Sequence, residues 1–459
     1  MKLQFLGGNH EVTGSSTLLQ IGGLNILIDC GIVQSQGGLV EFEKRHNFNT
    51  REFEGDINKL DYIILTHAHI DHIGRLPILL KQNPNIKVIA TKPTAKLAKI
   101  NLQDCAYLNA QECERYNKKS KSRRKKFKPI YTENEAIESA SYIESYDYNI
   151  EIPLNDKVSI YLKPAGHIIG ASMVEVVYRE KYFEKKFLFT GDTSALSSRI
   201  PFTKPADSLG IYDYIITEST YGDKQHEKIN FKEELYNSIK DVKGNVLLPT
   251  FSIHKSTVIL HFLYEIFKEH PEMDRFEVYL DSPMAAESHE IIRQSKDYWH
   301  NKWTNEVFNW DKIRFVNDYI ESQTLAEGTN RIIVSASGML SGGRAVTSHL
   351  SKILSQKNSK IIFTGYVCEG SLAEKILTTT HKTISINGRP VTIKAEREMI
   401  HFSSHADKNQ LVEFIKTSDK ERLKKVFIIH GDLKAQENLR KELQHHLKDV
   451  EIIIPKYKD

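Results

Sequence analysis

The sequence predicts an α/β protein built from more than one domain. Its first third contains short apolar and β-branched runs separated by Gly and Asn, a pattern typical of strands. From about residue 227 onward, such runs alternate with stretches of helical length, which indicates βαβ units and a parallel sheet. A chain of 459 residues is also longer than one ordinary core, and it fits two large domains or about three smaller ones.

Composition narrows the class of protein. An apolar share of 40% and a charged share of 27% are those of a soluble globular chain. No apolar stretch approaches the roughly 18 residues of a membrane helix, and residues 1–5 run directly into a strand pattern without a signal peptide. The scattered Cys30, Cys105, Cys113 and Cys368 disfavour a disulfide framework. We therefore expect a cytoplasmic protein without membrane contact, and a net charge of +4 neither requires nor excludes a nucleic-acid partner.

The first third is expected to form strands followed by one long helix. The strands are expected at 3–6, 16–21, 25–28 and 62–65, and the helix at 93–111, where a proline precedes an apolar stripe. The basic tract 118–128 that follows is too charged to pack in a core. We interpret it as a surface loop in preference to a dedicated RNA contact, although it would attract a polyanion.

The remaining elements divide the chain into blocks. Strands are expected at 158–162, 172–178, 186–189 and 212–217. The alternating block 210–392 is a candidate second domain, with helices such as 231–241 and 255–269 and strands such as 331–335. A strand at 425–429, a helix at 434–447 and a last strand at 450–454 are expected in the final block.

A dense set of metal-ligand side chains follows the strand expected at 62–65. His67, His69, Asp71 and His72 lie within six residues, and imidazole and carboxylate groups are ligands that zinc prefers. If the turn opens into a helix, His67 and His69 project from its extended part, and Asp71 and His72 from the start of the helix. One segment could therefore supply ligands to two neighbouring metal positions.

Further acidic and imidazole residues stand where other apolar runs end. They are Asp29, His167, Asp192 and His430. Each one alone is explained as a polar residue leaving a strand. In layered α/β folds, however, loops at one edge of a sheet converge on ligands, so we expect these side chains to meet.

Counting ligands predicts two zinc ions. One would take His67, His69 and His167, and the other Asp71, His72 and His430, with Asp192 between them. Such a pair could hold a hydroxide, lower its pKa and stabilise the charge on a phosphodiester during hydrolysis. Asp29 would orient a histidine or a metal-bound water by hydrogen bonding.

These residues resemble the metallo-β-lactamase superfamily, whose HxHxDH signature matches residues 67–72. More specifically, the chain resembles the β-CASP nucleases of that superfamily. The matching motifs are TESTYG at 217–222, FSSHAD at 402–407 and IHG at 429–431. DSPMA at 281–285, SASGM at 335–339 and GGR at 342–344 also match that family. The resemblance covers nearly the whole chain, and it is nearest to prokaryotic relatives of the endonuclease subunit of the cleavage and polyadenylation specificity factor.

The resemblance implies a metallo-β-lactamase αββα sandwich with an inserted, mainly parallel β-CASP domain. Residues 1–209 and 393–459 would form the sandwich in two parts, and 210–392 the insert, with the active site in the cleft between them. His405 would protonate the leaving 3′ oxygen with Glu218 beside it, so that Asp71, Asp192, Glu218 and His405 form the catalytic group. A histidine at position 430 resembles the RNA-cleaving branch of the family.

Weaker candidates for contact with RNA phosphates are Ser337, Gly338, Arg344 and Lys255. A Gly-rich turn and an arginine at a helix start explain the first three equally well. At Lys255 the family more often has arginine, and lysine keeps the charge but loses the planar fork that binds phosphate through two hydrogen bonds. Without a KH-type domain before the first strand, we expect the grip on the substrate to come from the cleft, the basic tract or partners. Without an RNase J-type domain after Asp459, processive 5′ exonuclease action is in doubt.

The predicted function is zinc-dependent hydrolysis of single-stranded RNA at internal bonds, leaving a 5′ phosphate and a 3′ hydroxyl as the family implies. One alternative is a non-catalytic RNA-binding scaffold subunit, although such paralogues tend to lose ligands and every ligand position is filled here. The other is hydrolysis of a small molecule such as a lactam or a thioester. RNA is the expected partner, and a homodimer is compatible with the sequence.

Overall fold

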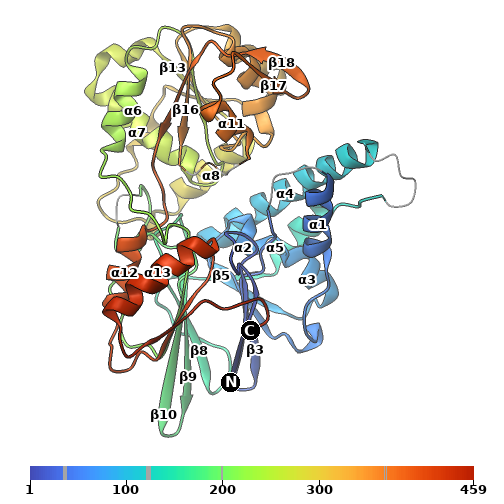
Figure 1. Cartoon of the computed structure of the whole chain (residues 1–459), viewed down its shortest axis with the longest axis vertical. Helices are drawn as coiled ribbons and strands as arrows, with labels where there is room; N and C mark the ends of the chain where they lie inside the picture. Colours follow the sequence, from blue (N-terminus) through green and yellow to red (C-terminus); the bar gives the residue numbers. More distant parts are fainter. Residues whose placement is uncertain (35–38, 120–125, 198–199, 366, 368–369) are drawn as a thin grey trace. The chain divides into compact units, whose positions relative to one another are not determined.

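The computed structural model describes residues 1–34, 39–119, 126–197, 200–365, 367 and 370–459 (Figure 1). Residues 120–125 of the basic tract lie outside this range, as does Cys368. The chain forms two compact units. Unit 1 comprises Met1–Gln225, Asp297–His300 and Ser404–Asp459, and unit 2 comprises His226–Lys296 and Asn301–Ser403.

The first sheet of unit 1 has six strands in sequence order. They are β1 (Lys2–Gly7), β2 (Ser16–Ile21), β3 (Leu24–Ile28), β4 (Tyr62–Ile64), β5 (Lys87–Thr91) and β6 (Ile143–Tyr146). The first three strands are antiparallel, and the strands from β3 to β6 run parallel. The carboxyl ends of β3 and β4 therefore lie at the same edge of the sheet, where the metal-ligand cluster begins.

The second sheet of unit 1 has seven strands. In sheet order they are β21 (Glu451–Ile453), β20 (Lys425–Ile428), β11 (Tyr214–Thr217), β10 (Phe183–Phe189), β9 (Ser172–Glu180), β8 (Val158–Pro164) and β7 (Ile152–Pro153). Strands β10, β11, β20 and β21 run parallel, and the remainder are antiparallel. The loops that follow β10, β11 and β20 consequently leave the sheet at one edge.

The two sheets face each other across one core. In β3, Ile26 and Ile28 point into this core, whereas Leu27 points to the other face, as the two-residue period of a strand requires. On that other face a second core includes residues of the helices α2 (Ile70–Ile73), α3 (Leu76–Gln82), α4 (Lys92–Lys119) and α5 (Glu133–Ser141). Helix α1 (Leu39–Thr50) packs through Phe42 on Cys113 and Tyr116 of α4. Helices α12 (Lys408–Lys416) and α13 (Leu433–His446) pack together, and α13 packs on β21 (Figure 1). Unit 1 is an αββα sandwich.

Unit 2 contains a six-stranded sheet in which all strands run parallel. In sheet order the strands are β14 (Ile313–Phe315), β13 (Glu277–Asp281), β15 (Arg331–Ser335), β12 (Val246–Pro249), β16 (Lys360–Thr364) and β19 (Glu396–Ile400). A separate hairpin joins β17 (Thr383–Ile386) to β18 (Arg389–Thr392). The helices are α6 (Phe231–Ile239), α7 (Lys255–Glu269), α8 (Pro283–Gln294), α9 (Tyr319–Thr324), α10 (Ser351–Leu354) and α11 (Leu372–Thr378). The α/β class and the parallel sheet predicted from the sequence are confirmed.

The division of the chain differs from the expected boundaries of 210 and 392 for physical reasons. Strand β11 completes the second sheet of unit 1 between β10 and β20, so residues up to Gln225 belong to unit 1. Strand β19 is the edge strand of the unit 2 sheet, so unit 2 extends to Ser403. The short segment Asp297–His300 belongs to unit 1 although its sequence neighbours belong to unit 2.

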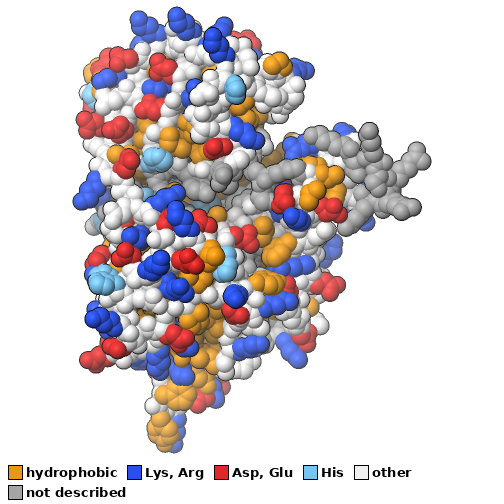
Figure 2. All heavy atoms as spheres, viewed as in Figure 1, with side chains coloured by type: hydrophobic (Ala, Val, Ile, Leu, Met, Phe, Trp, Pro, Cys, Tyr) orange, Lys and Arg blue, Asp and Glu red, His pale blue; other side chains and the backbone are white. Residues whose placement is uncertain are grey.

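The surface carries both signs of charge. On the face shown in Figure 2, Lys and Arg side chains are interspersed with Asp and Glu side chains, in keeping with the net charge of +4. Among the described residues, no helix is both long enough and apolar enough to span a bilayer.

Candidate metal centre

The segment 66–72 that follows β4, here called the hook, presents metal-ligand side chains both from extended backbone and from the short helix α2, as the sequence predicted. His67 follows the strand, and His69 stands at the N-cap of α2, which contains Asp71 and His72. The hook is fastened on both sides, since the Leu65 amide donates to Ile89 O at 2.9 Å and the Ser172 amide donates to Thr66 O at 2.8 Å. His67 and His72 are fully buried, so their imidazoles are held in fixed positions.

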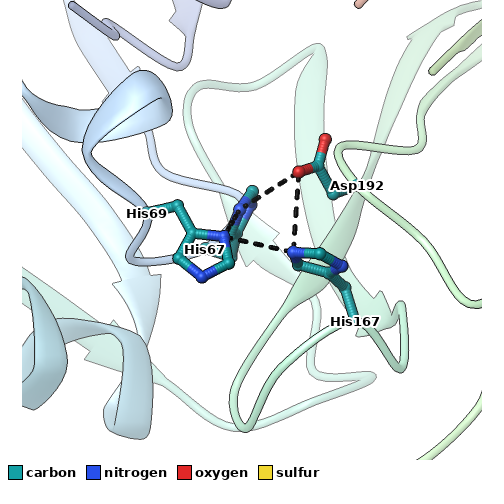
Figure 3. Close-up of side chains that lie close together, drawn as sticks. All are labelled: His67, His69, His167 and Asp192. Carbon is teal, nitrogen blue, oxygen red and sulfur yellow. Dashed lines mark hydrogen bonds and ion pairs between the residues drawn. The ribbon is translucent and has the colours of Figure 1, made fainter. Parts of the chain in front are cut away.

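Four side chains from three separate segments form the first group. Figure 3 shows His67, His69, His167 and Asp192 pointing toward one another. His69 Nδ1 lies 3.0 Å from His67 Nε2 and 3.1 Å from His167 Nε2. Asp192 Oδ2 lies 3.5 Å from His67 Nε2 and 3.6 Å from His167 Nε2. All four ligand atoms are within 4.8 Å of one another.

The second group lies on the other side of Asp192. It contains Asp71, His72 and His430, whose ligand atoms are also within 4.8 Å of one another. His430 Nε2 lies 3.2 Å from His72 Nε2 and 3.5 Å from Asp71 Oδ2. Asp192 Oδ1 is 3.3 Å from both His72 Nε2 and His430 Nδ1. The two oxygens of Asp192 therefore face different groups.

The donor set fits metal ions better than it fits internal hydrogen bonds. When the hydrogen of each neutral ring is on Nδ1, as the contact of His72 Nδ1 with Asp29 favours, the facing Nε2 atoms of His72 and His430 are both acceptors, and a shared cation satisfies both. Asp192 is 3% exposed, yet its Oδ1 accepts no hydrogen bond. Burial of a charged carboxylate oxygen costs folding free energy unless a hydrogen bond or a bound cation compensates for the lost contact with water. The residues of both groups therefore fit divalent cations.

The electrostatics keep most of these imidazoles neutral, which is the form that binds a metal. Burial lowers the pKa of His67 and His167 well below the usual value and lowers that of His69 to about 4. For His72, burial acts in the same direction, but the nearby carboxylates of Asp192 and Asp29 outweigh it and raise the pKa.

Neighbouring polar groups orient the ligands. Asp29 Oδ2 lies 2.7 Å from His72 Nδ1 and also accepts from the Thr66 hydroxyl at 2.8 Å, while its Oδ1 accepts from the Thr66 amide. Ser404 Oγ lies 3.1 Å from His167 Nδ1, and Thr220 Oγ1 lies 3.3 Å from His430 Nδ1. Asp29 lies where the sequence suggested. The three hydroxyl residues were not predicted, although Thr66 and Ser404 stand directly beside predicted site residues.

The loop that carries His430 is held by the backbone. His430 follows β20 with φ 51°, its amide donates to Gly8 O at 2.8 Å, and its carbonyl accepts from the Ser219 amide at 3.0 Å. A Cβ at Gly431 would lie 2.3 Å from Ser219 Oγ. Only glycine at position 431 therefore allows the loop to approach the segment after β11 this closely.

The predicted pair of Glu218 and His405 is in hydrogen-bond contact. His405 Nδ1 lies 2.9 Å from Glu218 Oε2, and the Thr193 amide donates to Glu218 Oε1 at 2.7 Å. His405 Nε2 points toward the cluster and lies 3.9 Å from Asp192 Oδ2. Burial alone would lower the pKa of His405, but the charges of Glu218 and Asp192 raise it to about 9. These carboxylates therefore favour the protonated, proton-donating form of the imidazole.

The candidate RNA contacts lie in unit 2 and have partners there. Arg344 Nη1 donates to Asp281 Oδ1 at 2.7 Å and to Val316 O at 2.9 Å. Lys255 Nζ donates to Phe402 O at 2.6 Å. Ser337 Oγ lies 3.1 Å from Ser341 Oγ, and a Cβ at Gly338 would lie 3.3 Å from Phe251 N. Their contact with RNA stays a prediction.

Three family models match successive parts of the chain. The Metallo-beta-lactamase superfamily model matches residues 11–107, the Beta-Casp domain model matches 257–376, and the model of the Zn-dependent metallo-hydrolase RNA specificity domain matches 390–455. Together they follow the order that the resemblance implied, and the Beta-Casp match falls between the two long segments of unit 1, Met1–Gln225 and Ser404–Asp459.

Whole-chain relatives agree with these matches. Ribonuclease TTHA0252 of Thermus thermophilus is 28% identical, over 94% of this chain and 93% of the relative. Endoribonuclease YSH1 of Yarrowia lipolytica is 26% identical over 95% of this chain, which spans only 51% of that relative. Transcription termination factor FttA of Methanothermobacter thermautotrophicus is 26% identical over 94% of this chain and 67% of the relative.

A solved structure shares the fold. A protein of unknown function from Enterococcus faecalis V583 aligns with a TM-score of 0.56 at 12% identity, over 100% of this chain and 98% of the other. With the ligand groups, the three family models and the whole-chain relatives in agreement, this chain belongs to the β-CASP family of metallo-β-lactamase-fold ribonucleases.

Proposed function

We propose that this protein is a zinc-dependent ribonuclease that hydrolyses internal phosphodiester bonds of single-stranded RNA. The observation that carries the proposal is the position of Asp192, whose two oxygens face two imidazole groups while the His405–Glu218 pair lies beside it. Two of the similar proteins are named as a ribonuclease and an endoribonuclease, which supports the same reaction for this chain.

Two zinc ions are the proposed metals, because His-rich ligation with carboxylates favours zinc over manganese. His67, His69 and His167 would hold one, Asp71, His72 and His430 the other, and Asp192 would serve both. When bound, such a pair supplies positive charge at the scissile phosphate and an activated water at neutral pH.

The other residues of the site position groups and move protons. Asp29 fixes His72 with its Nδ1 hydrogen directed at a carboxylate, which leaves Nε2 free to be a ligand. Glu218 holds His405 through Nδ1, so that Nε2 carries the proton that we assign to the leaving 3′ oxygen. The expected products carry a 5′ phosphate and a 3′ hydroxyl.

The two rival functions are less well supported. A non-catalytic RNA-binding subunit does not require intact ligand groups, yet all seven predicted ligands converge here. Hydrolysis of a small lactam or thioester does not require the Glu218–His405 pair. A cytoplasmic location and a homodimer stay predictions, which fractionation and light scattering would test.

The test uses one single-stranded RNA labelled at either its 5′ or its 3′ end, incubated with zinc-loaded protein and with chelator-treated protein. We expect internal fragments from both labels, loss of cleavage with chelator, and recovery when zinc is restored. His67→Ala should abolish cleavage and reduce bound zinc, whereas His445→Ala, an exposed histidine near the end of α13, should change neither.

Three results would contradict the proposal. RNA binding without cleavage by a protein that lacks stoichiometric zinc would favour the scaffold function. Rapid turnover of a lactam or thioester, with no effect on RNA, would favour the small-molecule hydrolase. Release of mononucleotides from the 5′ label alone would replace internal cleavage by 5′ exonuclease action.

A further inference from the structure

Unit 1 includes four residues that the sequence order places in the middle of unit 2. The chain leaves unit 2 after Lys296, contributes Asp297–His300 to unit 1, and returns to unit 2 at Asn301. Within this segment Tyr298 is 6% exposed and Trp299 is 8% exposed. Two large buried aromatic side chains make the segment part of the interior of unit 1.

Tyr298 packs beside one end of the loop that carries His167. Its hydroxyl donates to Asp147 Oδ1 at 2.7 Å, and its ring meets the ring of Tyr148 edge-on with centroids 4.8 Å apart. The Tyr148 hydroxyl donates in turn to Ala171 O at 2.9 Å. Ala171 closes the loop 165–171, so Tyr298 supports that loop through a single intervening residue.

Trp299 is connected to the other end of the same loop through the segment from Phe202 to Pro205. Its ring packs on Phe202 with centroids 5.0 Å apart, and Lys204 Nζ donates to Asp297 O at 3.0 Å. A Cβ at Gly166 would lie 3.0 Å from both Lys204 O and Pro205 Cα. The segment that carries Phe202 and Lys204 is therefore pressed against the start of the loop.

The His167 loop is also held by other parts of unit 1, since Ala165 O accepts from the Ser194 amide at 2.9 Å and from the Thr193 hydroxyl at 2.9 Å, and Ser404 Oγ lies 3.1 Å from His167 Nδ1. The loop lies between β8 and β9 and contains neither a helix nor a strand, although Gly166 forms an isolated bridge with Thr193 and Gly170 O accepts from the hydroxyls of Thr91 and Thr94. A shift of the loop would move His167 Nε2, which lies 3.1 Å from His69 Nδ1. The second group of ligands takes no residue from this loop.

We propose that Tyr298 and Trp299 are positioning residues for His167, and that they set the affinity of one of the two metal positions. They act through the two ends of the loop. The inference rests on the proposed metal centre, and it assigns a role in that centre to residues outside the family motifs that supply the ligands.

The test compares matched aromatic substitutions by zinc binding rather than by RNA cleavage. Trp299→Ala and Tyr298→Phe are compared with Trp310→Ala, which removes an aromatic ring packed on Tyr264 and Phe267 within unit 2. Bound zinc is counted by elemental analysis and titrated against a chromophoric chelator, and the cobalt-substituted protein is followed by its visible spectrum.

For Trp299→Ala we expect one zinc equivalent to bind about tenfold more weakly while the other is unchanged, in the range seen when groups that orient metal ligands are removed. The cobalt spectrum should change as well. Tyr298→Phe should show a smaller shift of the same equivalent, and Trp299→Phe should restore near wild-type binding. Trp310→Ala should leave both equivalents and the spectrum unchanged.

Retention of both zinc equivalents at wild-type affinity in Trp299→Ala and Tyr298→Phe would overturn the inference. Equal weakening of both equivalents, accompanied by a lower unfolding temperature, would also overturn it, because the segment would then act on stability alone. Zinc binding without RNA cleavage in the wild-type protein would overturn only the proposed function. A wild-type protein that binds no zinc would overturn both.

Discussion

Two buried aspartates, one in each unit, show how similar sequence contexts lead to different roles. Asp192 follows β10 in unit 1 and is 3% exposed, while Asp281 ends β13 in unit 2 and is fully buried. Both have histidines beside them. Asp281 accepts from Arg344 at 2.7 Å and from Ser322 at 2.6 Å, and it lies 2.5 Å from His349 Nε2.

The surroundings of Asp192 are arranged differently. Its histidine neighbours stand at 3.3 to 3.9 Å, and its Oδ1 accepts no hydrogen bond. A carboxylate whose hydrogen bonds are complete is a structural part of a core, whereas one surrounded by imidazole nitrogens at longer distances is arranged for a cation. Both aspartates are buried and both lie near histidines. What separates the structural role from the metal-binding arrangement is whether the carboxylate oxygens accept hydrogen bonds.

Of the substitutions at the two aspartates, Asp192→Ala should have the largest effect on RNA cleavage and on zinc content. Because the two oxygens of Asp192 face both groups, we expect loss of detectable RNA cleavage together with loss of bound zinc. Elemental analysis and the end-labelled RNA assay measure the two losses. Full zinc content in this variant would show that Asp192 is not a shared ligand.

A second variant separates proton transfer from metal binding within unit 1. His405→Ala should lower the cleavage rate by about 100- to 10,000-fold, the usual contribution of a general acid, while both zinc ions remain. Single-turnover cleavage rates and zinc content are the measurements. Cleavage at the normal rate would contradict the assignment of His405 as the acid.

The reverse pattern is expected for Asp281→Ala. Removal of one partner from a buried charged network costs about 3–5 kcal/mol of stability, because Arg344 and His349 lose their partner. Chemical denaturation measures this change, and zinc content should be unaffected in the folded protein. After chelator treatment, Asp192→Ala should lose less unfolding free energy than Asp281→Ala. The opposite order would contradict the assignment of a structural role to Asp281 and a metal-binding role to Asp192.

The smallest effect concerns acid stability. Burial alone would raise the pKa of Asp281, but hydrogen bonds from His349, Ser322 and Arg344 outweigh it and lower the pKa below the usual value. A carboxyl whose pKa is depressed by folding stabilises the fold above its unfolded pKa, and this contribution is lost as pH falls through the folded pKa. Asp281→Ala should therefore flatten the loss of unfolding free energy below about pH 4, the ordinary pKa of an aspartate. An unchanged slope would show that Asp281 is not the titrating group.

The sequence predicted which side chains come together at the candidate metal centre, because most of the pattern is local. His67, His69, Asp71 and His72 are adjacent in the chain, and Asp192 and His430 each follow a recognisable apolar run. The hydroxyl groups that orient them could not be predicted, since Ser404 and His167 are 237 residues apart and only the fold brings them to 3.1 Å.

Elements with weak periodicity were also missed. Helix α1 was not predicted, because its sequence LVEFEKRHNFNT mixes charged and apolar residues without a continuous stripe, and it buries only Phe42, His46 and Asn49. The assignment of Asp297–His300 to unit 1 depends on contacts with Asp147 and Phe202, which no local pattern indicates.

The path of the chain through this segment limits how the protein can be dissected. Because the chain passes between the units at four points, removal of residues 226–403 would take Tyr298 and Trp299 away from unit 1 as well. Phe202, which is fully buried in the whole chain, would lose its aromatic neighbour. A deletion intended to isolate the αββα sandwich would thus also remove part of its interior, and a faithful minimal version must supply those four residues in another way.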